Sequence, residues 1–146
     1  MKRKFYLASP FFNEDEIKIY NEVIAILRKN KNIDLFVPRE HEFEDGHNMP
    51  NNVWGKEVFL VDKNAIDESE VVIVLNFGMY SDSGTAWEAG YAYAKEKVVY
   101  QILCGDKNTD YSLMMLNGTT YIMSIDDLRN GIIPNQSEMY KKFVQK

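Results

Sequence analysis

The sequence predicts an α/β fold: a single domain over residues 1–146, built as a doubly wound, five-stranded parallel sheet with helices on both faces. Short β-branched and aromatic runs alternate with segments of helical periodicity, as they do in right-handed crossover units. The run 71–76 is almost continuously apolar, which is typical of a strand buried on both faces. For five such strands the common flavodoxin-like order is 2-1-3-4-5.

The expected strands are short apolar runs, most of them ended by proline, glycine or polar residues. They cover residues 4–8, 33–37, 71–76, 98–103 and 119–123. Between the second and third strands, residues 39–52 are polar and include two histidines, so a long loop is expected there. Both histidines, His41 and His47, are interpreted as solvated because nothing in the sequence orients them.

The expected helices have apolar residues at helical spacing or a capping residue at their start. They lie at about 14–30 (capped by Asn13), 53–66, 84–94, 125–128 (capped by Ser124) and 137–145, with a short apolar turn at 113–116. Ser83 or Thr85 is expected to cap the helix that begins near residue 84.

Composition excludes several classes of partner. A net charge of −5 with scattered basic residues argues against a nucleic-acid polymer. No apolar run reaches the length of a membrane span, and no signal-peptide core follows the first residues, so no membrane partner and a cytoplasmic location are expected. One cysteine and two histidines give no zinc ligand set, and the glycines form no dinucleotide fingerprint, so neither metal nor cofactor is expected.

The strand order places a crevice at the carboxyl ends of the first and third strands, where ligands bind in open α/β sheets. The loop at 8–12 would face the helix start that carries Asp82 and Glu88. Glu88 is expected in the first helical turn and ionised unless burial opposes it, although such an acid is also a routine feature of helices. Asp62 falls inside an apolar helical stripe, where it either needs a partner or sits at the rim.

Carboxylates beside flat apolar surfaces suit a neutral ligand with a ring and hydroxyl groups. In retaining glycoside chemistry, one carboxylate attacks the anomeric carbon while a second acid assists the leaving group. The residues alone indicate this class of chemistry and no particular substrate.

At these residues the sequence resembles the nucleoside 2-deoxyribosyltransferases. Residues 6–12, Y-L-A-S-P-F-F, are similar to the family's opening Y-[LF]-[AG]-x-x-[WF]-F. Residues 82–92 are similar to its D-x-G-x-x-x-E-x-G-Y-A, and residues 62–66 to its D-x-x-x-I segment before the third strand. The resemblance runs along nearly the whole chain, in order.

The resemblance implies a role for each matching residue. Glu88 would be the nucleophile that forms a covalent deoxyribosyl ester, and Tyr6 would orient it. Asp62 and Asp82 would face the base and the sugar, and one of them would protonate the departing base. Further substrate contacts are implied for Ala8, Phe11, Phe12, Glu42, Gly84, Ser112, Met114 and Asn117. A homo-oligomer in which a neighbouring subunit completes the site is also implied.

The sequence departs from the family before Leu113, where Ser112 replaces the usual asparagine. A serine there is similar to the 2′-deoxynucleoside 5′-monophosphate N-glycosidases, which are hydrolases; Asn117 is a second source of the missing amide. Asp82 points the other way, because its charge would repel a 5′-phosphate. The expected function is therefore transfer of 2-deoxyribose between nucleobases, with the nucleoside and nucleobase as partners. The alternatives are hydrolysis of deoxynucleotides and a non-catalytic sensor of nucleotide derivatives.

Overall fold

A computed structural model describes residues 2–41, 48–80 and 82–131. Its core is a five-stranded, all-parallel sheet in the order β2-β1-β3-β4-β5, as the sequence predicts. The elements, in chain order, are β1 (Arg3–Ala8), α1 (Glu14–Arg28), β2 (Ile33–Phe36), η1 (Pro38–His41), α2 (Asn51–Glu68), β3 (Val71–Asn76), α3 (Ser83–Ala94), β4 (Val98–Leu103), α4 (Leu113–Asn117), β5 (Tyr121–Ser124) and α5 (Ile125–Arg129).

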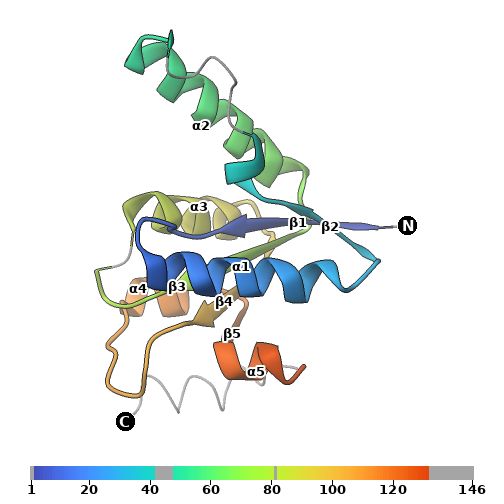
Figure 1. Ribbon diagram of the computed structural model, residues 1–146, viewed down its shortest axis with the longest axis vertical. Helices are drawn as coiled ribbons and strands as arrows, with labels where there is room; N and C mark the ends of the chain where they lie inside the picture. Colours follow the sequence, from blue (N-terminus) through green and yellow to red (C-terminus); the bar gives the residue numbers. More distant parts are fainter. Residues whose placement is uncertain (1, 42–47, 81, 132–146) are drawn as a thin grey trace.

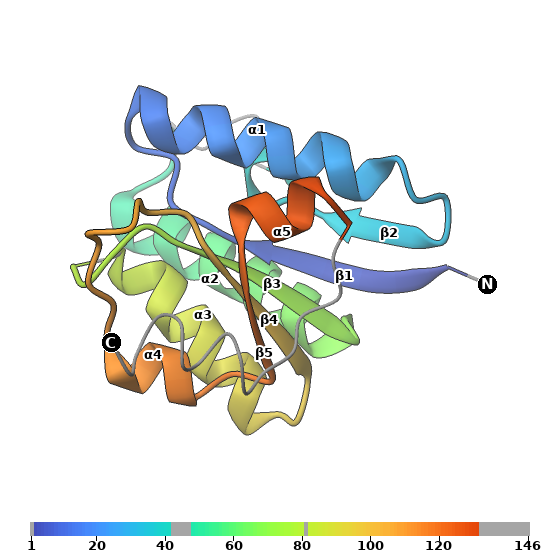
Figure 2. The same ribbon diagram turned by 90° about the horizontal axis from the view of Figure 1, so that it is seen from below.

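Helices cover both faces of the sheet. In Figure 1, α2 and α3 lie above it and α1 and α5 below, and Figure 2 shows α1 and α5 from their own side. Each layer has its own apolar core: α1 and α5 pack on one face around Leu7 and Ile73, and α2 and α3 pack on the other around Val72 and Val74. All six residues of β3 are buried, which explains why the first five are apolar and why Asn76 pairs with Gln101.

Local signals in the sequence account for most element boundaries. Asn13 caps α1 by accepting a hydrogen bond from the Glu16 amide, and Ser124 forms a capping box with Asp127 at the start of α5. Both caps agree with the sequence prediction. The helix expected over 137–145 lies outside the described residues.

Two of the boundaries that differ from the expectation have a visible cause. The fifth strand begins at Tyr121 rather than residue 119, because Thr119 and Thr120 bind the backbone of Val99 through their hydroxyl groups instead of extending the strand. The start of the expected polar loop forms the 3-10 helix η1, which begins at Pro38. Proline fixes the backbone angle that a helical turn needs.

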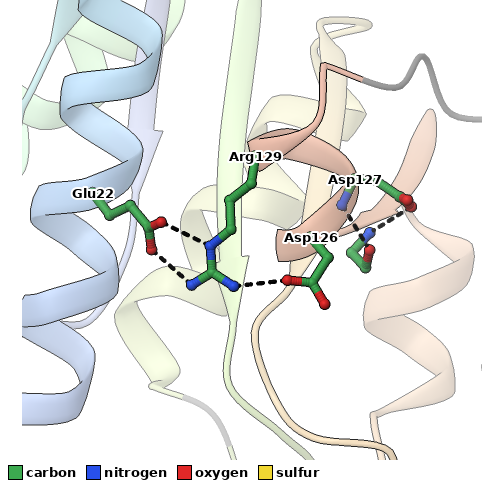
Figure 3. A network of polar contacts seen from close by, with 5 residues as sticks. Glu22, Asp126, Asp127 and Arg129 are labelled. Carbon is green, nitrogen blue, oxygen red and sulfur yellow. Dashed lines mark hydrogen bonds and ion pairs between the residues drawn. The ribbon is translucent and has the colours of Figure 1, made fainter.

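An arginine joins the first and the last helix of the described chain. Arg129 of α5 places its guanidinium between Glu22 of α1, at 2.7 and 2.8 Å, and Asp126 of its own helix, at 2.8 Å (Figure 3). The contact holds α5 beside α1 on one face of the sheet. Within the ranges that the structure describes, no helix is long and apolar enough to cross a membrane.

Candidate active site

A cavity of about 200 Å³ opens at the carboxyl ends of β1 and β3, where the strand order predicts a crevice. Its wall comes from the loop after β1, from η1, from α2 and from the start of α3. It is lined by Leu7, Ser9, Pro10, Phe11, Phe12, Tyr20, Pro38, Arg39, His41, Trp54, Val58, Val61, Asp62, Asp82 and Glu88. An adjoining cavity of about 300 Å³ shares Asp62 and Glu88 and adds Gly84.

Glu88 lies where the two cavities meet, and Tyr6 holds its side chain. The Tyr6 hydroxyl donates a hydrogen bond to Glu88 Oε2. The Tyr6 ring is fully buried and stacks on Phe36, with ring centroids 5.5 Å apart. Burial and the nearby Glu88 charge raise the pKa of Tyr6, so the phenol stays protonated and remains a donor.

Glu88 differs from the sequence expectation in position and in charge. It is the sixth residue of α3, one turn beyond the first, so the free amide groups at the helix start do not set its charge. Burial is the largest effect and raises the pKa of Glu88 to about 7; the charges of Asp62 and Asp82 also raise it, and the Tyr6 hydrogen bond lowers it. Glu88 therefore exchanges its proton near neutral pH.

Asp62 approaches the same space from α2. Its side chain lines both cavities. Of the two interpretations of the sequence, the structure therefore supports the one in which the carboxylate faces a pocket beside the apolar stripe. Burial raises the pKa of Asp62 to about 6, against a smaller lowering by His41. The carboxyl groups of Asp62 and Glu88 therefore have pKa values close to each other, at about 6 and about 7.

Contacts between α2 and α3 fix the position of Asp62. The Tyr91 hydroxyl donates to Asp67 at 2.5 Å, and Lys97 donates to the Asp67 carbonyl at 2.7 Å. The Trp87 ring stacks on Tyr91 and meets Phe59 edge-on, each with centroids 5.1 Å apart. The helix that carries Asp62 is therefore anchored along the helix that carries Glu88.

Asp82 has a structural task that the sequence interpretation gave to Ser83 or Thr85. Its carboxylate caps α3 by accepting hydrogen bonds from the Thr85 amide and hydroxyl, both at 2.9 Å. Gly84 leaves room for this, since a Cβ there would lie 3.2 Å from Asp82 Oδ2. Asp82 caps α3 in preference to Ser83 or Thr85, because a negative charge is favoured at the start of a helix.

Asp82→Ala is expected to lower the free energy of unfolding by about 1 kcal/mol, the usual cost of losing a helix cap. Urea denaturation of the variant measures this. Ser83→Ala is the matched control, because Ser83 is exposed and occupies the first helical position without capping it. An equal loss of stability in both variants would contradict the assignment of the cap to Asp82.

Aromatic residues from the loop after β1 form one side of the cavity. Phe11 is half-buried and stacks on Phe12, with centroids 6.0 Å apart; Phe12 is 76% exposed. Ala8, at the end of β1, is fully buried in the core and does not line the cavity.

The structure does not bring every expected residue to the cavity. Ser112 caps α4, Asn117 donates to the Leu113 carbonyl on the same helix, and Met114 is 85% exposed. None of the three lines either cavity that contains Glu88. Glu42 and His47 lie outside the described residues.

Other lining residues were missed in the sequence. His41 is exposed, yet it is not simply solvated: its ring stacks on Phe36, with centroids 4.1 Å apart, and lines the cavity. Arg39 and Trp54 flank the polar segment without matching any motif. The signal available for Arg39 was Pro38, because proline favours the first position of a helix and so indicates a turn directly after the second strand. In the described part of the chain, no cluster of three metal-binding side chains occurs.

Known proteins match this chain in sequence and in structure. The sequence model of the nucleoside 2-deoxyribosyltransferases matches residues 5–128. The 2-deoxyribosyltransferase of the psychrotolerant bacterium Bacillus psychrosaccharolyticus is 27% identical, with a TM-score of 0.75 over 93% of this chain and 95% of that one.

Two further structures share the fold. A CMP N-glycosidase of Clostridium botulinum is 21% identical, with a TM-score of 0.56 over 94% of each chain. A conserved protein of Enterococcus faecalis V583 is 19% identical, with a TM-score of 0.65 over 99% of each chain. No curated protein sequence matches this one. Because the family model spans most of the sequence, the chain belongs to the nucleoside 2-deoxyribosyltransferase family.

Proposed function

We propose that the protein transfers 2-deoxyribose between nucleobases through a covalent ester on Glu88. The observation that carries this proposal is the hydrogen bond from Tyr6 to Glu88, made beside Asp62 at the junction of two cavities. A positioned carboxylate next to a carboxyl group that binds a proton near pH 6 matches the requirements of a retaining displacement.

In the first step, a carboxylate oxygen of Glu88 attacks C1′ of the bound nucleoside. The bond between C1′ and the base nitrogen breaks, and its electron pair passes to the nitrogen, which takes the proton of Asp62. Asp62 is the better donor of the two aspartates, because Asp82 already accepts two hydrogen bonds as a helix cap.

In the second step, an acceptor base displaces the ester. Its ring nitrogen attacks C1′, the bond to Glu88 breaks, and the nitrogen's proton passes to the Asp62 carboxylate. Two displacements at one carbon leave the anomeric configuration unchanged. The apolar lining from Phe11, Val58 and Val61 would favour a flat base over water in the acceptor position.

A second copy of the chain is part of the proposal. Met114 and Leu113 are 85% and 60% exposed on α4, which is unusual for adjacent apolar residues of a monomer. In an oligomer, this end of α4 would contact the cavity of a neighbouring subunit. Light scattering of the protein measures the assembly, and Met114→Asp is expected to weaken it.

The function is tested by incubating thymidine with adenine and analysing the products. Formation of deoxyadenosine supports transfer. Release of base from deoxynucleoside monophosphates, with no transfer, would support the hydrolase, for which Ser112 in place of asparagine is the favouring observation. Binding of nucleosides with no turnover would support the sensor.

The covalent step has its own test. A 2′-fluorinated nucleoside slows breakdown of the ester, so intact-mass spectrometry is expected to show one added sugar per chain. Peptide mapping is expected to find it on the fragment that contains Glu88. A sugar on another fragment would overturn the assignment of the nucleophile.

Tyr6→Phe is expected to lower kcat/KM about ten- to hundredfold with little loss of stability, because a phenyl ring keeps the stacking on Phe36. The lost hydrogen bond no longer lowers the pKa of Glu88, so the acid side of the pH profile moves toward higher pH. Tyr100→Phe is the matched control, since that ring also stacks, on Tyr121, and is remote from the cavity. An unmoved acid side would contradict the role of Tyr6.

A further inference from the structure

The cavity has a second polar end, formed by Tyr20 of α1 and Arg39 of η1 around the ring of Phe11. The Arg39 guanidinium carbon lies 5.6 Å from the centre of the Phe11 ring, and Phe11 and Tyr20 pack with centroids 5.5 Å apart. All three residues line the cavity that contains Glu88. We call this group of three residues the donor end.

The Tyr20 hydroxyl is a buried polar group that lacks a partner. The residue is 2% exposed, and its oxygen makes no hydrogen bond within the described ranges. Burial is the largest effect and raises the pKa of the hydroxyl to about 12, while the charge and the backbone of the nearby Arg39 lower it. Buried hydroxyl groups are rarely left unpaired, so this one would gain a partner from a ligand that packs against the Tyr20 ring.

Arg39 is also available. It is exposed at the cavity mouth, and among the described residues no carboxylate pairs with it, whereas Arg28 on the preceding helix is taken up by Glu40. The flat Phe11 ring holds the guanidinium by a cation–π contact. A ligand stacked on Phe11 would lie beside the fork of Arg39.

The two ends of the cavity have opposite character. The carboxyl groups of Asp62, Asp82 and Glu88 line one part of the cavity, whereas the donor end contributes a guanidinium and a phenol. A nucleoside has the same asymmetry, because its sugar carries hydroxyl donors for the carboxylates and its base carries acceptors. The base therefore fits the donor end.

We propose that Arg39, with Tyr20, makes the protein selective for 6-oxopurines as the transferred bases, a proposal that rests on the proposed function. Arginine binds the adjacent O6 and N7 acceptors of such a base with both arms of its fork. The Tyr20 hydroxyl adds a third donor and no cation.

Other bases match this edge less well. Adenine has an acceptor at N7 but an amino donor at position 6, which would face the guanidinium. Cytosine has two adjacent acceptors, O2 and N3, but O2 flanks the glycosidic nitrogen and would lie toward the carboxylates. A hydrogen-bonding site discriminates strongly when the wrong base leaves buried donors unpaired.

Calorimetric binding of free bases to the whole protein tests this inference without requiring turnover. Wild type is expected to bind hypoxanthine at least tenfold more tightly than adenine or cytosine. Arg39→Ala is expected to remove most of this preference, and Arg39→Lys to restore little of it, because lysine keeps the charge and loses the fork. Tyr20→Phe is expected to weaken hypoxanthine binding about threefold or more.

Arg3→Ala is the matched control, because Arg3 also lies over a phenylalanine, Phe5 at 5.9 Å, at the other end of β1. Equal binding of all three bases by wild type, or an unchanged preference in Arg39→Ala, would overturn the inference. Full rescue by lysine, or a larger loss for inosine 5′-phosphate than for hypoxanthine, would show that Arg39 reads charge and would also overturn it. Failure of transfer between two 6-oxopurines, from deoxyinosine to guanine, with the hypoxanthine preference intact, would remove the transfer function and keep the base selectivity.

Discussion

Glu88→Gln is expected to abolish deoxyribosyl transfer while making the folded protein more stable at pH 8. The amide keeps the size of the side chain and can still accept the Tyr6 hydrogen bond, but it cannot form the ester. Loss of the nucleophile in a covalent mechanism costs on the order of 10⁴-fold or more. The rate of deoxyadenosine formation measures this loss.

The stability gain follows from the raised pKa of Glu88. The pKa of Glu88 is about 7 in the folded protein and 4.5 in the unfolded chain, so folding favours the protonated carboxyl. Wild type therefore loses stability as the pH rises from about 4.5 to 7, and the loss persists above 7. Glutamine removes this cost, worth about 1–3 kcal/mol at pH 8 and little below pH 5.

Denaturant unfolding at pH 5 and pH 8 is the measurement. Glu57→Gln is the matched control, since Glu57 is exposed on α2 and lines neither cavity that contains Glu88. That variant is expected to change neither activity nor the difference in stability between the two pH values. A Glu88→Gln protein that is less stable than wild type at pH 8 would contradict the burial argument.

Asp62→Asn is expected to lower kcat/KM about 10²- to 10⁴-fold for a nucleoside whose base needs a proton to leave. In wild type, the reactive pair is ionised Glu88 with protonated Asp62. With pKa values of about 7 and 6, this form is a minority species that is most populated between pH 6 and 7. The rate is expected to fall on both sides of that range.

The variant changes the profile in a defined way. Without Asp62 the alkaline fall is lost, and the acid side moves to lower pH because one charge that raises the pKa of Glu88 is gone. A p-nitrophenyl 2-deoxyriboside serves as the control donor, since its leaving group has a low pKa and departs without a proton. An equal loss of rate with both donors would show that Asp62 does not supply the proton.

The sequence was sufficient to predict the order of the strands in the sheet, but not the protonation states of the carboxyl groups in the site. Strand order followed from alternating local patterns, and the apolar run at 71–76 could be placed on both faces at once. The pKa of Glu88 could not be predicted, because it depends on how deeply the side chain is buried. Part of that burial comes from α2, which begins at Asn51, 37 residues earlier in the chain.

Two site features were hidden for a similar reason. Asp82, Ser83 and Thr85 can all cap a helix, and only the backbone path decides which of them does. Arg39 has no motif around it, and its availability depends on Arg28 rather than Arg39 having paired with Glu40. Competition among neighbours of the same type is decided by geometry that a sequence pattern does not contain.

The first half of α2 gives the cavity one wall that is independent of the sheet. None of residues 51–60 is buried, and this half projects beyond the strands (Figure 1), while its Trp54 and Val58 line the cavity. The nucleophile and its phenol partner stand on β1 and α3, at the opposite wall. Residues 51–60 can therefore change in sequence, and reshape this wall, without altering a residue of either apolar core.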